Sequence, residues 1–403
     1  MSKFRHRDRS ADGEPLSQGR VEYLEAARTR ARNRRLRRTA VIVITLTLIV
    51  AFATGMVGTS IVRAKDLVDT VQILLTPQAG FPQQTGITEL WAAEPLSGGF
   101  VLMGEDSCVV YSEGGSRINS IQSGYARPAL AAGKTRFVLY NRSGTELRVE
   151  SRTQNLYTKT MEHSIYLCAV ADAGQLAVVT DNTSSMARLT VYSSTMEQLL
   201  SWDLTSAEGI PMRMAFAPDS RSLALAGVTA KDGRLSTGVY LLDLAQGDPV
   251  CLGTAQTMPQ WLGWLSQDRL LAVFEDRAVL YDAAGETAAY DFTAGQLAGV
   301  SVSEEGAALL LENGQLCTAV LLDAQLNVQF SGGVPSANRI VRSAEGFYLL
   351  TDNAVECFDA AGEYQWEQSL AVRPQALLAG KQTLVFCGNT VQLLTPPETE
   401  PAQ

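Results

Sequence analysis

The stretch YDAAGETAAYDF spans Tyr281–Phe292, and FDAAGEYQWEQS spans Phe358–Ser369. Both contain DAAGE directly after an aromatic residue, and the copies begin 77 positions apart, at Asp282 and Asp359. A short apolar run precedes each copy, and a second short run follows it. This repetition at the same place between strand-like runs indicates a chain assembled from similar structural units.

A residue that ends a short apolar run and precedes a turn recurs along most of the chain, at intervals of about 40 residues. Each unit holds about four runs of four to eight residues, rich in Val, Leu, Tyr and Thr. Residues 163–204 show the plan in SIYLCAVA, QLAVVTD, RLTVYSS and LLSWDL. Helical periodicity is missing from the units, which excludes helical repeats. The recurring positions are Ser112, Ser151, Ser193, Asp243, Asp282, Asp323, Asp359 and Thr395.

Four short strands in about 40 residues are typical of one blade of a β-propeller. Eight recurring positions predict an all-β, eight-bladed propeller over residues 87–396, with a seven-bladed ring as the alternative if residues 87–123 serve as a cover. Large apolar side chains should pack between neighbouring blades, so that no blade is stable alone. The turn glycines that suit positive φ are Gly174, Gly285, Gly306 and Gly362.

The last unit lacks an outer strand, because only PPETEPAQ follows the last recurring position. An open ring would leave strand edges unpaired. The segment TVQILLTP, Thr70–Pro77, shares TVQ and LLTP with TVQLLTP, Thr390–Pro396. We therefore expect a closing strand at residues 70–76, within a linker of residues 63–86. Residues 397–403 are rich in Pro and Glu and are expected to be disordered.

The N-terminal segment is basic, whereas the rest of the chain is acidic. Residues 1–38 hold twelve Lys or Arg and five acids, net +7, so the overall −9 leaves −16 for the remainder. Residues 39–62 carry no charge, and as a helix they would span about 36 Å, enough for a ~30 Å hydrocarbon core. The positive-inside rule predicts one membrane span with residues 63–403 outside. A signal peptide cleaved near AFA, residues 51–53, is the alternative.

The basic run RTRARNRRLRR, residues 28–38, ends where the predicted span begins. Arg34, Arg35, Arg37 and Arg38 are expected to face anionic lipid on the cytoplasmic side. Contact with a cytoplasmic protein is the alternative. Nucleic-acid binding is not expected, because no aromatic residues are interleaved with the arginines and no folded motif accompanies them.

Motifs for catalysis or metal binding are not found. One histidine, His163, follows residue 38; it is expected in a surface loop, and without G-x-S-x-G it gives no hydrolase triad. No phosphate-binding glycine motif is present, so no catalytic residue, cofactor or metal is predicted. The cysteines have no metal-site spacing and are expected to be mainly buried free thiols, although an exterior location permits disulfides. They are Cys108, Cys168, Cys251, Cys317, Cys357 and Cys387.

Trp261 and Trp264 lie three residues apart in QWLGW. On a strand, they would face opposite sides of the sheet. Packing between blades is one interpretation; the other is an aromatic platform for a partner at one mouth of the central channel.

The stretch AFAPDSRSLALAG, Ala215–Gly227, resembles the "SPDG…LA" hairpin of bacterial propellers. The two DAAGE stretches resemble the D-x-x-G-x-x-x-W phrase of quinoprotein-like repeats, with Trp366 at the tryptophan position and Tyr290 in its place earlier. The resemblance implies a quinoprotein-like or WD-like propeller. A basic tail, one anchor and an exterior propeller also resemble uncharacterised membrane-anchored propellers of Gram-positive bacteria, which implies a location at the cytoplasmic membrane.

Three functions are compatible with these observations. The first is a non-enzymatic binding or scaffolding module for a protein partner at the cell envelope. The second is a quinoprotein-like dehydrogenase that depends on a cofactor and Ca²⁺. The third is a sensor that relays an exterior signal to the cytoplasmic tail. The fold alone does not rank them.

Overall fold

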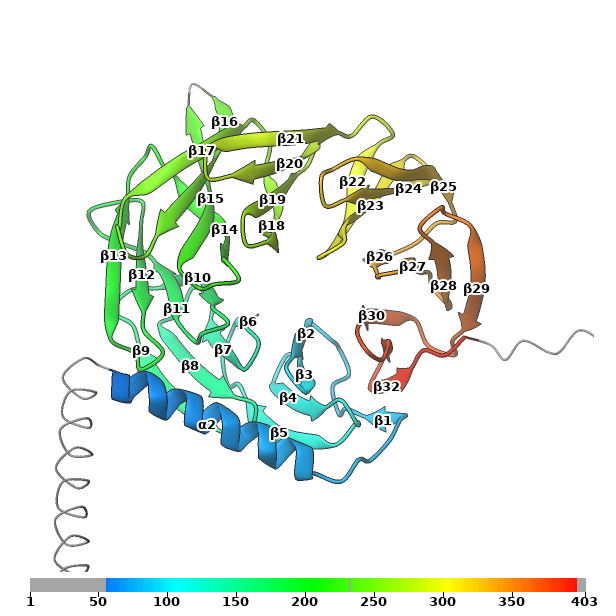
Figure 1. Cartoon of the computed structure of the whole chain (residues 1–403), viewed down its shortest axis with the longest axis horizontal. Helices are drawn as coiled ribbons and strands as arrows, with labels where there is room; N and C mark the ends of the chain where they lie inside the picture. The colour runs from blue at the N-terminus through cyan, green and yellow to red at the C-terminus, as the bar shows by residue number, and fades with distance from the viewer. Residues whose placement is uncertain (1–55, 232, 397–403) are drawn as a thin grey trace, which may run out of the picture. The chain divides into compact units, whose positions relative to one another are not determined.

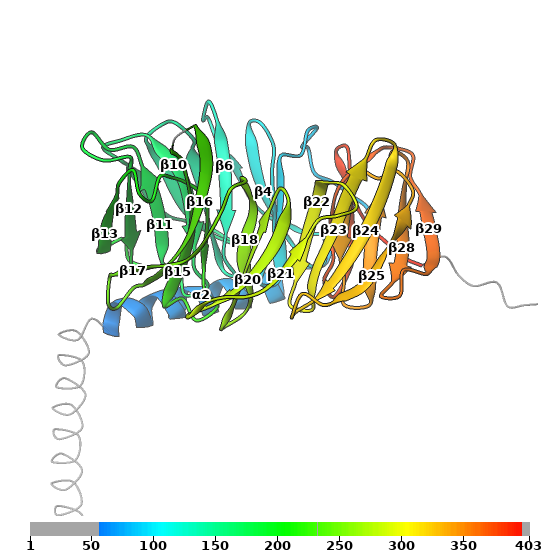
Figure 2. The same cartoon turned by 90° about the horizontal axis from the view of Figure 1, so that it is seen from above.

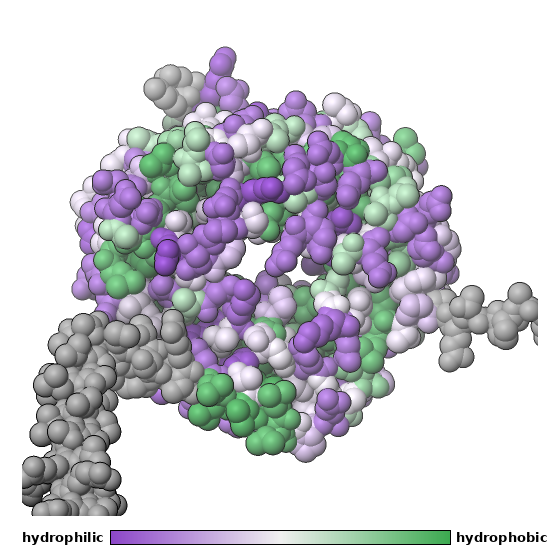
Figure 3. Space-filling model, viewed as in Figure 1, coloured by the Kyte–Doolittle hydropathy of each residue, from purple (hydrophilic) through white to green (hydrophobic). Residues whose placement is uncertain are grey.

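The computed structural model describes residues 56–231 and 233–396. Within them, eight four-stranded antiparallel sheets surround a central opening, and one helix, α2 (Met56–Leu75), precedes the first sheet (Figures 1 and 3). The predicted all-β, eight-bladed propeller is therefore confirmed, and the seven-bladed alternative is wrong. Each sheet is one blade, and its strands follow one another from the channel outward.

The first four blades are continuous in sequence. Blade 1 contains β2 (Ala92–Leu96), β3 (Gly99–Met103), β4 (Ser107–Ser112) and β5 (Arg117–Gln122). Blade 2 contains β6 (Pro128–Ala132), β7 (Arg136–Asn141), β8 (Glu146–Ser151) and β9 (Asn155–Thr160). Blade 3 contains β10 (Ile165–Val170), β11 (Leu176–Thr180), β12 (Ala187–Tyr192) and β13 (Gln198–Leu204). Blade 4 contains β14 (Ile210–Phe216), β15 (Ser222–Lys231), β16 (Arg234–Asp243) and β17 (Pro249–Ala255).

The last blade differs from the others because its outer strand comes from before blade 1. Blade 5 contains β18 (Pro259–Ser266), β19 (Arg269–Phe274), β20 (Arg277–Asp282) and β21 (Gly285–Asp291). Blade 6 contains β22 (Gln296–Ser303), β23 (Gly306–Asn313), β24 (Leu316–Asp323) and β25 (Val328–Val334). Blade 7 contains β26 (Arg339–Arg342), β27 (Gly346–Leu350), β28 (Ala354–Asp359) and β29 (Tyr364–Ser369). Blade 8 contains β30 (Pro374–Leu378), β31 (Leu384–Cys387), β32 (Thr390–Leu393) and β1 (Gln83–Gln84).

The recurring Ser or Asp stabilises the turn between the third and fourth strands of its blade. The Asp282 carboxylate accepts hydrogen bonds from the amides of Ala284 (2.7 Å) and Gly285 (3.1 Å). The Asp359 carboxylate accepts them from the amides of Ala361 and Glu363, both at 2.9 Å. A short side chain with an oxygen acceptor is required at this position, so the sequence repeats there. Ser112, Ser151, Ser193, Asp243 and Asp323 accept turn amides in the same way.

Apolar side chains fill the spaces between neighbouring blades. Leu271 and Val273 of blade 5 meet Leu309 and Leu311 of blade 6, and all four are fully buried. At the junction of blades 1 and 8, a second cluster places the Phe100 and Phe386 rings edge to face, 5.6 Å apart. Each blade thus contributes one face to each of two clusters, as predicted for a ring of repeats.

The segment expected to close the ring is not a strand. Residues 70–75 belong to α2, so the prediction of a closing strand at residues 70–76 is wrong. Strand β1 occupies the outer position instead, with Gln83 opposite Val391 and Gln84 opposite Thr390. The shared TVQ and LLTP letters misled because β-branched and aliphatic residues suit both a half-buried strand and a helix that is packed by other contacts.

Several predictions fall on residues that the structure does not describe. They include the cytoplasmic segment 1–38, most of the predicted span 39–62 and the tail 397–403. Within residues 56–231 and 233–396, no helix is long and apolar enough to cross a bilayer.

Candidate interaction surface

Helix α2 runs along one flat side of the ring (Figure 2). This side, here called the α2 face, carries the turns that join the first to the second and the third to the fourth strands of each blade. The helix bonds directly to blade 2, where Arg152 in the β8–β9 turn donates to the Asp66 carbonyl. The two arginines of blade 2 that hold the helix also donate to neighbouring blades, Arg152 to the Ser97 carbonyl of blade 1 and Arg136 to the Ser194 carbonyl of blade 3. The helix is therefore fastened to blade 2, and the same arginines link that blade to blades 1 and 3.

Two buried arginines of blade 2 hold the helix. The Arg136 Nη2 atom lies 3.3 Å from the Asp66 Oδ1 atom, and its Nη1 atom donates to the Ser194 carbonyl at 3.2 Å. Arg152 donates from Nη2 to the Asp66 carbonyl (3.0 Å) and the Thr70 hydroxyl (2.8 Å). Both arginines are 2% exposed. Charge-assisted hydrogen bonds of this kind are roughly twice as strong as neutral ones, so they tie α2 to the ring.

Asp69 and Ile73 complete the same side of the helix. The Thr153 hydroxyl donates to the Asp69 carboxylate at 2.6 Å, and both Asp69 and Ile73 are buried. Burial lowers the pKa of the Arg152 guanidinium, and the negative charges of Asp69 and Asp66 oppose this shift. On α2, the residues that face the ring follow the i, i+3, i+4, i+7 spacing of one helix face. They are Asp66, Asp69, Thr70 and Ile73. The clamp, as the name is used below, comprises these four residues of α2 and their partners Arg136, Arg152 and Thr153 on blade 2.

The opposite side of α2 is apolar and faces outward. Leu67 is 65% exposed, Leu74 78% and Leu75 78%, and Val68 and Val71 lie between them. In Figure 3 a hydrophobic patch marks this part of the molecule. These five residues are called the apolar stripe below.

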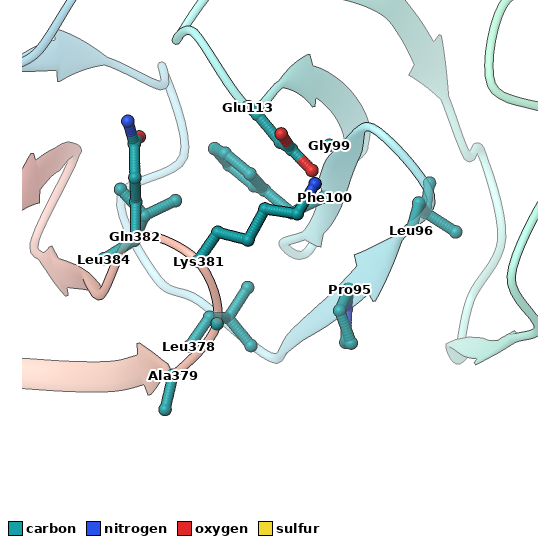
Figure 4. Close-up of a pocket in the computed structure, with 11 residues that line it drawn as sticks. Pro95, Leu96, Gly99, Phe100, Glu113, Leu378, Ala379, Lys381, Gln382 and Leu384 are labelled. Atoms are coloured by element: carbon teal, nitrogen blue, oxygen red, sulfur yellow. The ribbon is translucent and has the colours of Figure 1, made fainter. Parts of the chain in front are cut away.

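A pocket opens at the seam between blades 1 and 8, on the α2 face. Its volume is about 330 Å³. Apolar side chains supply most of its wall, and Glu113 and Lys381 are the charged residues at its rim (Figure 4). This seam pocket is lined by Pro95, Leu96, Gly99, Phe100, Glu113, Leu378, Ala379, Gly380, Lys381, Gln382 and Leu384. It can take an apolar group of a ligand beside a polar one.

A larger cavity of about 530 Å³ lies along the inner strands β2, β22, β26 and β30, which face the central channel. Glu94 and Arg339 are the charged residues of its wall. The Glu94 side chain is accessible to solvent, but protein atoms lie on most sides of it. The desolvation that they cause raises the pKa of its carboxyl group.

Trp261 and Trp264 both lie on β18, the inner strand of blade 5, and are half-buried. Trp261 packs between blades 5 and 6, whereas Trp264 packs between blades 4 and 5 and donates from its indole nitrogen to the Ala215 carbonyl at 3.2 Å. They face opposite sides of the sheet, as expected. A role for them in partner contact remains a prediction.

The other predicted positions are dispersed. His163 lies in the turn before β10 and lines a polar pocket of about 330 Å³ with Lys159 and Arg188. In the part of the chain that the structure describes, no three His, Cys, Asp or Glu side chains are placed to hold a metal ion. The cysteines are free thiols; Cys251 is exposed, Cys357 is half-buried, and the other four are buried. Arg34, Arg35, Arg37 and Arg38 precede the first described residue.

Sequence reasoning did not identify the clamp or the seam pocket. The spacing of Asp66, Asp69, Thr70 and Ile73 was a helix signal that could have revealed one side of the clamp. Its partners on blade 2 are about 70 to 86 residues away in sequence, and no pattern links them. The seam pocket joins turns of the first and last blades, so only the closed ring shows it.

This geometry defines an eight-bladed β-propeller with a helix fastened to one face. The chain belongs to a family of unknown function, DUF5711, whose model matches residues 83–331. Comparison with curated proteins gives no match.

Solved structures show the same fold at low sequence identity. Sqt1 from Chaetomium thermophilum, bound to the N-terminus of the ribosomal protein L10, is 13% identical with a TM-score of 0.52, over 77% of this chain and 98% of that one. AztD from Citrobacter koseri, in its apo form, is 12% identical with a TM-score of 0.53, over 71% of this chain and 87% of that one. BamB from Moraxella catarrhalis is 15% identical with a TM-score of 0.49, over 78% of this chain and 98% of that one.

Proposed function

We propose that this protein is a membrane-anchored, extracytoplasmic propeller that acts as a non-enzymatic protein-binding module at the cell envelope. The seam pocket is the observation that carries the proposal. It is open and mostly apolar, and its Glu113 and Lys381 rim offers one acceptor and one donor to a partner. An apolar anchor in a pocket with a polar rim is the usual arrangement of a protein-binding site.

Further support comes from the fold and from the sequence. The Sqt1 propeller is bound to the N-terminus of the ribosomal protein L10, so this architecture is able to hold a segment of another protein. The uncharged residues 39–62 and the net charge of +7 before them favour a span with the propeller outside. Residues after that span enter the clamp, which would couple the anchor to the ring.

Site-directed photo-crosslinking in cells tests the pocket. We expect a photoreactive amino acid at Gln382, in the pocket, to form one protein adduct of defined size. The same amino acid at Leu316, which is 74% exposed and begins β24 on the opposite face, should form none. Lys381→Glu should reduce the adduct at Gln382 by removing the rim donor. No adduct at Gln382, or equal adducts at both positions, would refute the pocket as a binding site.

Thiol labelling of intact cells tests the location. Cys251 is the exposed cysteine of the described residues, and it lies on β17 of blade 4. A membrane-impermeant maleimide should label the full chain in intact cells, and Cys251→Ser should abolish the labelling. Labelling that appears only after lysis would place the propeller inside the cell.

A further inference from the structure

Helix α2 is amphipathic in the reverse sense to a helix on a water-exposed protein surface. Asp66, Asp69 and Thr70 face the ring, where the clamp satisfies them. The apolar stripe faces away from it, with Leu74 and Leu75 each 78% exposed. Burying a leucine side chain is worth about 1.5–3 kcal/mol, so the stripe favours an apolar surrounding.

We infer that the apolar stripe lies in the boundary between the headgroups and the acyl chains of the bilayer, and that the ring leans on the membrane by this edge. The inference rests on the proposed membrane anchor. The uncharged run 39–62 overlaps the start of α2 at residues 56–62. Only Arg63, Ala64 and Lys65 separate this run from Asp66, the first residue of the clamp. A segment that leaves a bilayer and enters a helix fixed to the ring cannot carry its stripe far from the lipid.

The position of the apolar stripe limits the contact to one edge. Exposed Lys65 precedes the stripe on α2, where it suits anionic headgroups. Across the ring, the turns of blades 5 to 7 on the same face present the exposed acids Asp268, Glu304 and Glu345. Blades 1 and 3 carry exposed acids on this face too, Glu113 and Glu197. The tilt therefore follows from the stripe, because α2 is fastened to blade 2: that side of the ring should lie near the membrane, and blades 5 to 7 away from it. A second copy of the chain would cover the stripe without any such tilt.

The test uses the full chain in vesicles of phosphatidylcholine and phosphatidylglycerol, with Cys251→Ser to remove the exposed thiol. An NBD fluorophore is placed on Leu74→Cys in the stripe or, as the matched control, on Leu316→Cys of the opposite face. Because interfacial helices bury their apolar side about 5–10 Å into this boundary, nitroxide-labelled lipid should reduce the emission at position 74 roughly twofold. The emission at position 316 should be unchanged.

Each outcome decides between the alternatives. A chain that floats with the vesicles but shows no quenching at position 74 keeps the anchor and overturns the lipid contact. A blue shift at position 74 that grows with protein concentration in detergent, and is unaffected by nitroxide lipid, means that a second copy covers the stripe. A chain that does not float with the vesicles refutes the anchor itself, and this inference with it.

Discussion

The carboxylate of Asp66 on α2 lies 3.3 Å from the guanidinium of Arg136 on β7, and this arginine is 2% exposed. A buried charge that loses its partner is strongly destabilising, so this pair fixes where the helix sits. Through it, a segment outside the eight repeats becomes part of the ring. The pair also gives the most direct test of the clamp.

We expect Asp66→Asn and Arg136→Met to be coupled in the free energy of unfolding. Each single variant should destabilise the ring, and the double-mutant cycle should give a coupling of about 0.5–3 kcal/mol, because the pair shares one partly buried network. Urea unfolding of the full chain in detergent, followed by fluorescence, gives the four values.

The exposed pair of Arg188 and Asp203 is the matched control. Its Nε and Oδ1 atoms are closer, at 2.6 Å, but the side chains are 39% and 48% exposed. The Arg188→Met and Asp203→Asn cycle should therefore give only about 0.2–1 kcal/mol. A coupling at the exposed pair equal to that at the buried pair would mean that the clamp does not position α2.

The ring closure depends on Thr85. Its hydroxyl accepts a hydrogen bond from the buried amide of Ile87 (3.2 Å) and donates to the Asn389 carbonyl (3.0 Å). Thr85→Val keeps the shape but leaves that amide unsatisfied, so it should lower the free energy of unfolding by about 1–3 kcal/mol. Thr76→Val removes an exposed hydroxyl that bonds to the Gln72 carbonyl and should change stability by about 0.5 kcal/mol or less. Equal urea midpoints for the two variants would contradict the role of Thr85.

One fast thiol is expected in the native protein. Burial raises the pKa of the Cys108 thiol to about 12 and those of Cys357 and Cys387 to about 11, so these groups stay protonated at neutral pH. Exposed Cys251 should react first with a chromogenic disulfide reagent, and all six cysteines should react in urea. Cys251→Ser should remove the fast phase. Two or more fast thiols in the native chain would show that the blades open.

Glu94 should make the stability of the ring depend on pH. Desolvation raises the pKa of its carboxyl above 4.5, so the folded state binds the proton more tightly than the unfolded chain. This tighter proton binding stabilises the folded state fully below the pKa that Glu94 has in the unfolded chain. The stabilisation is lost as the pH rises through the pKa that Glu94 has in the folded state. Glu94→Gln should therefore raise the melting temperature at about pH 8, but not at about pH 4. The same increase at both pH values would exclude titration as its cause.

The repeats were predictable because they arise from local chemistry. Asp282 and Asp359 appear in identical phrases since each side chain accepts the amides of its own turn, a few residues away. The strands around them are short apolar runs, which composition and spacing reveal. Local interactions of this kind leave a signal in any sequence window that contains them.

The clamp and the closure depend on contacts that are distant in sequence. Val71 and Ile73 are β-branched and favoured a strand, but Asp66 and Thr70 of the same segment bind Arg136 and Arg152, and these contacts stabilise a helix. Only two residues, Gln83 and Gln84, pair with the final strand, which is too short a run to stand out in the sequence.

Blade 8 draws on both ends of the propeller, since Thr85 and Asn389 are 304 positions apart. A ribosome delivers β1 before any blade exists and β32 only after all the others. Throughout translation, the Phe100 side of blade 1 therefore has no neighbour to cover it. Chains whose translation stops early should keep this apolar face of blade 1 exposed. Chaperones and quality-control proteases could use the exposed face to distinguish them from the finished protein.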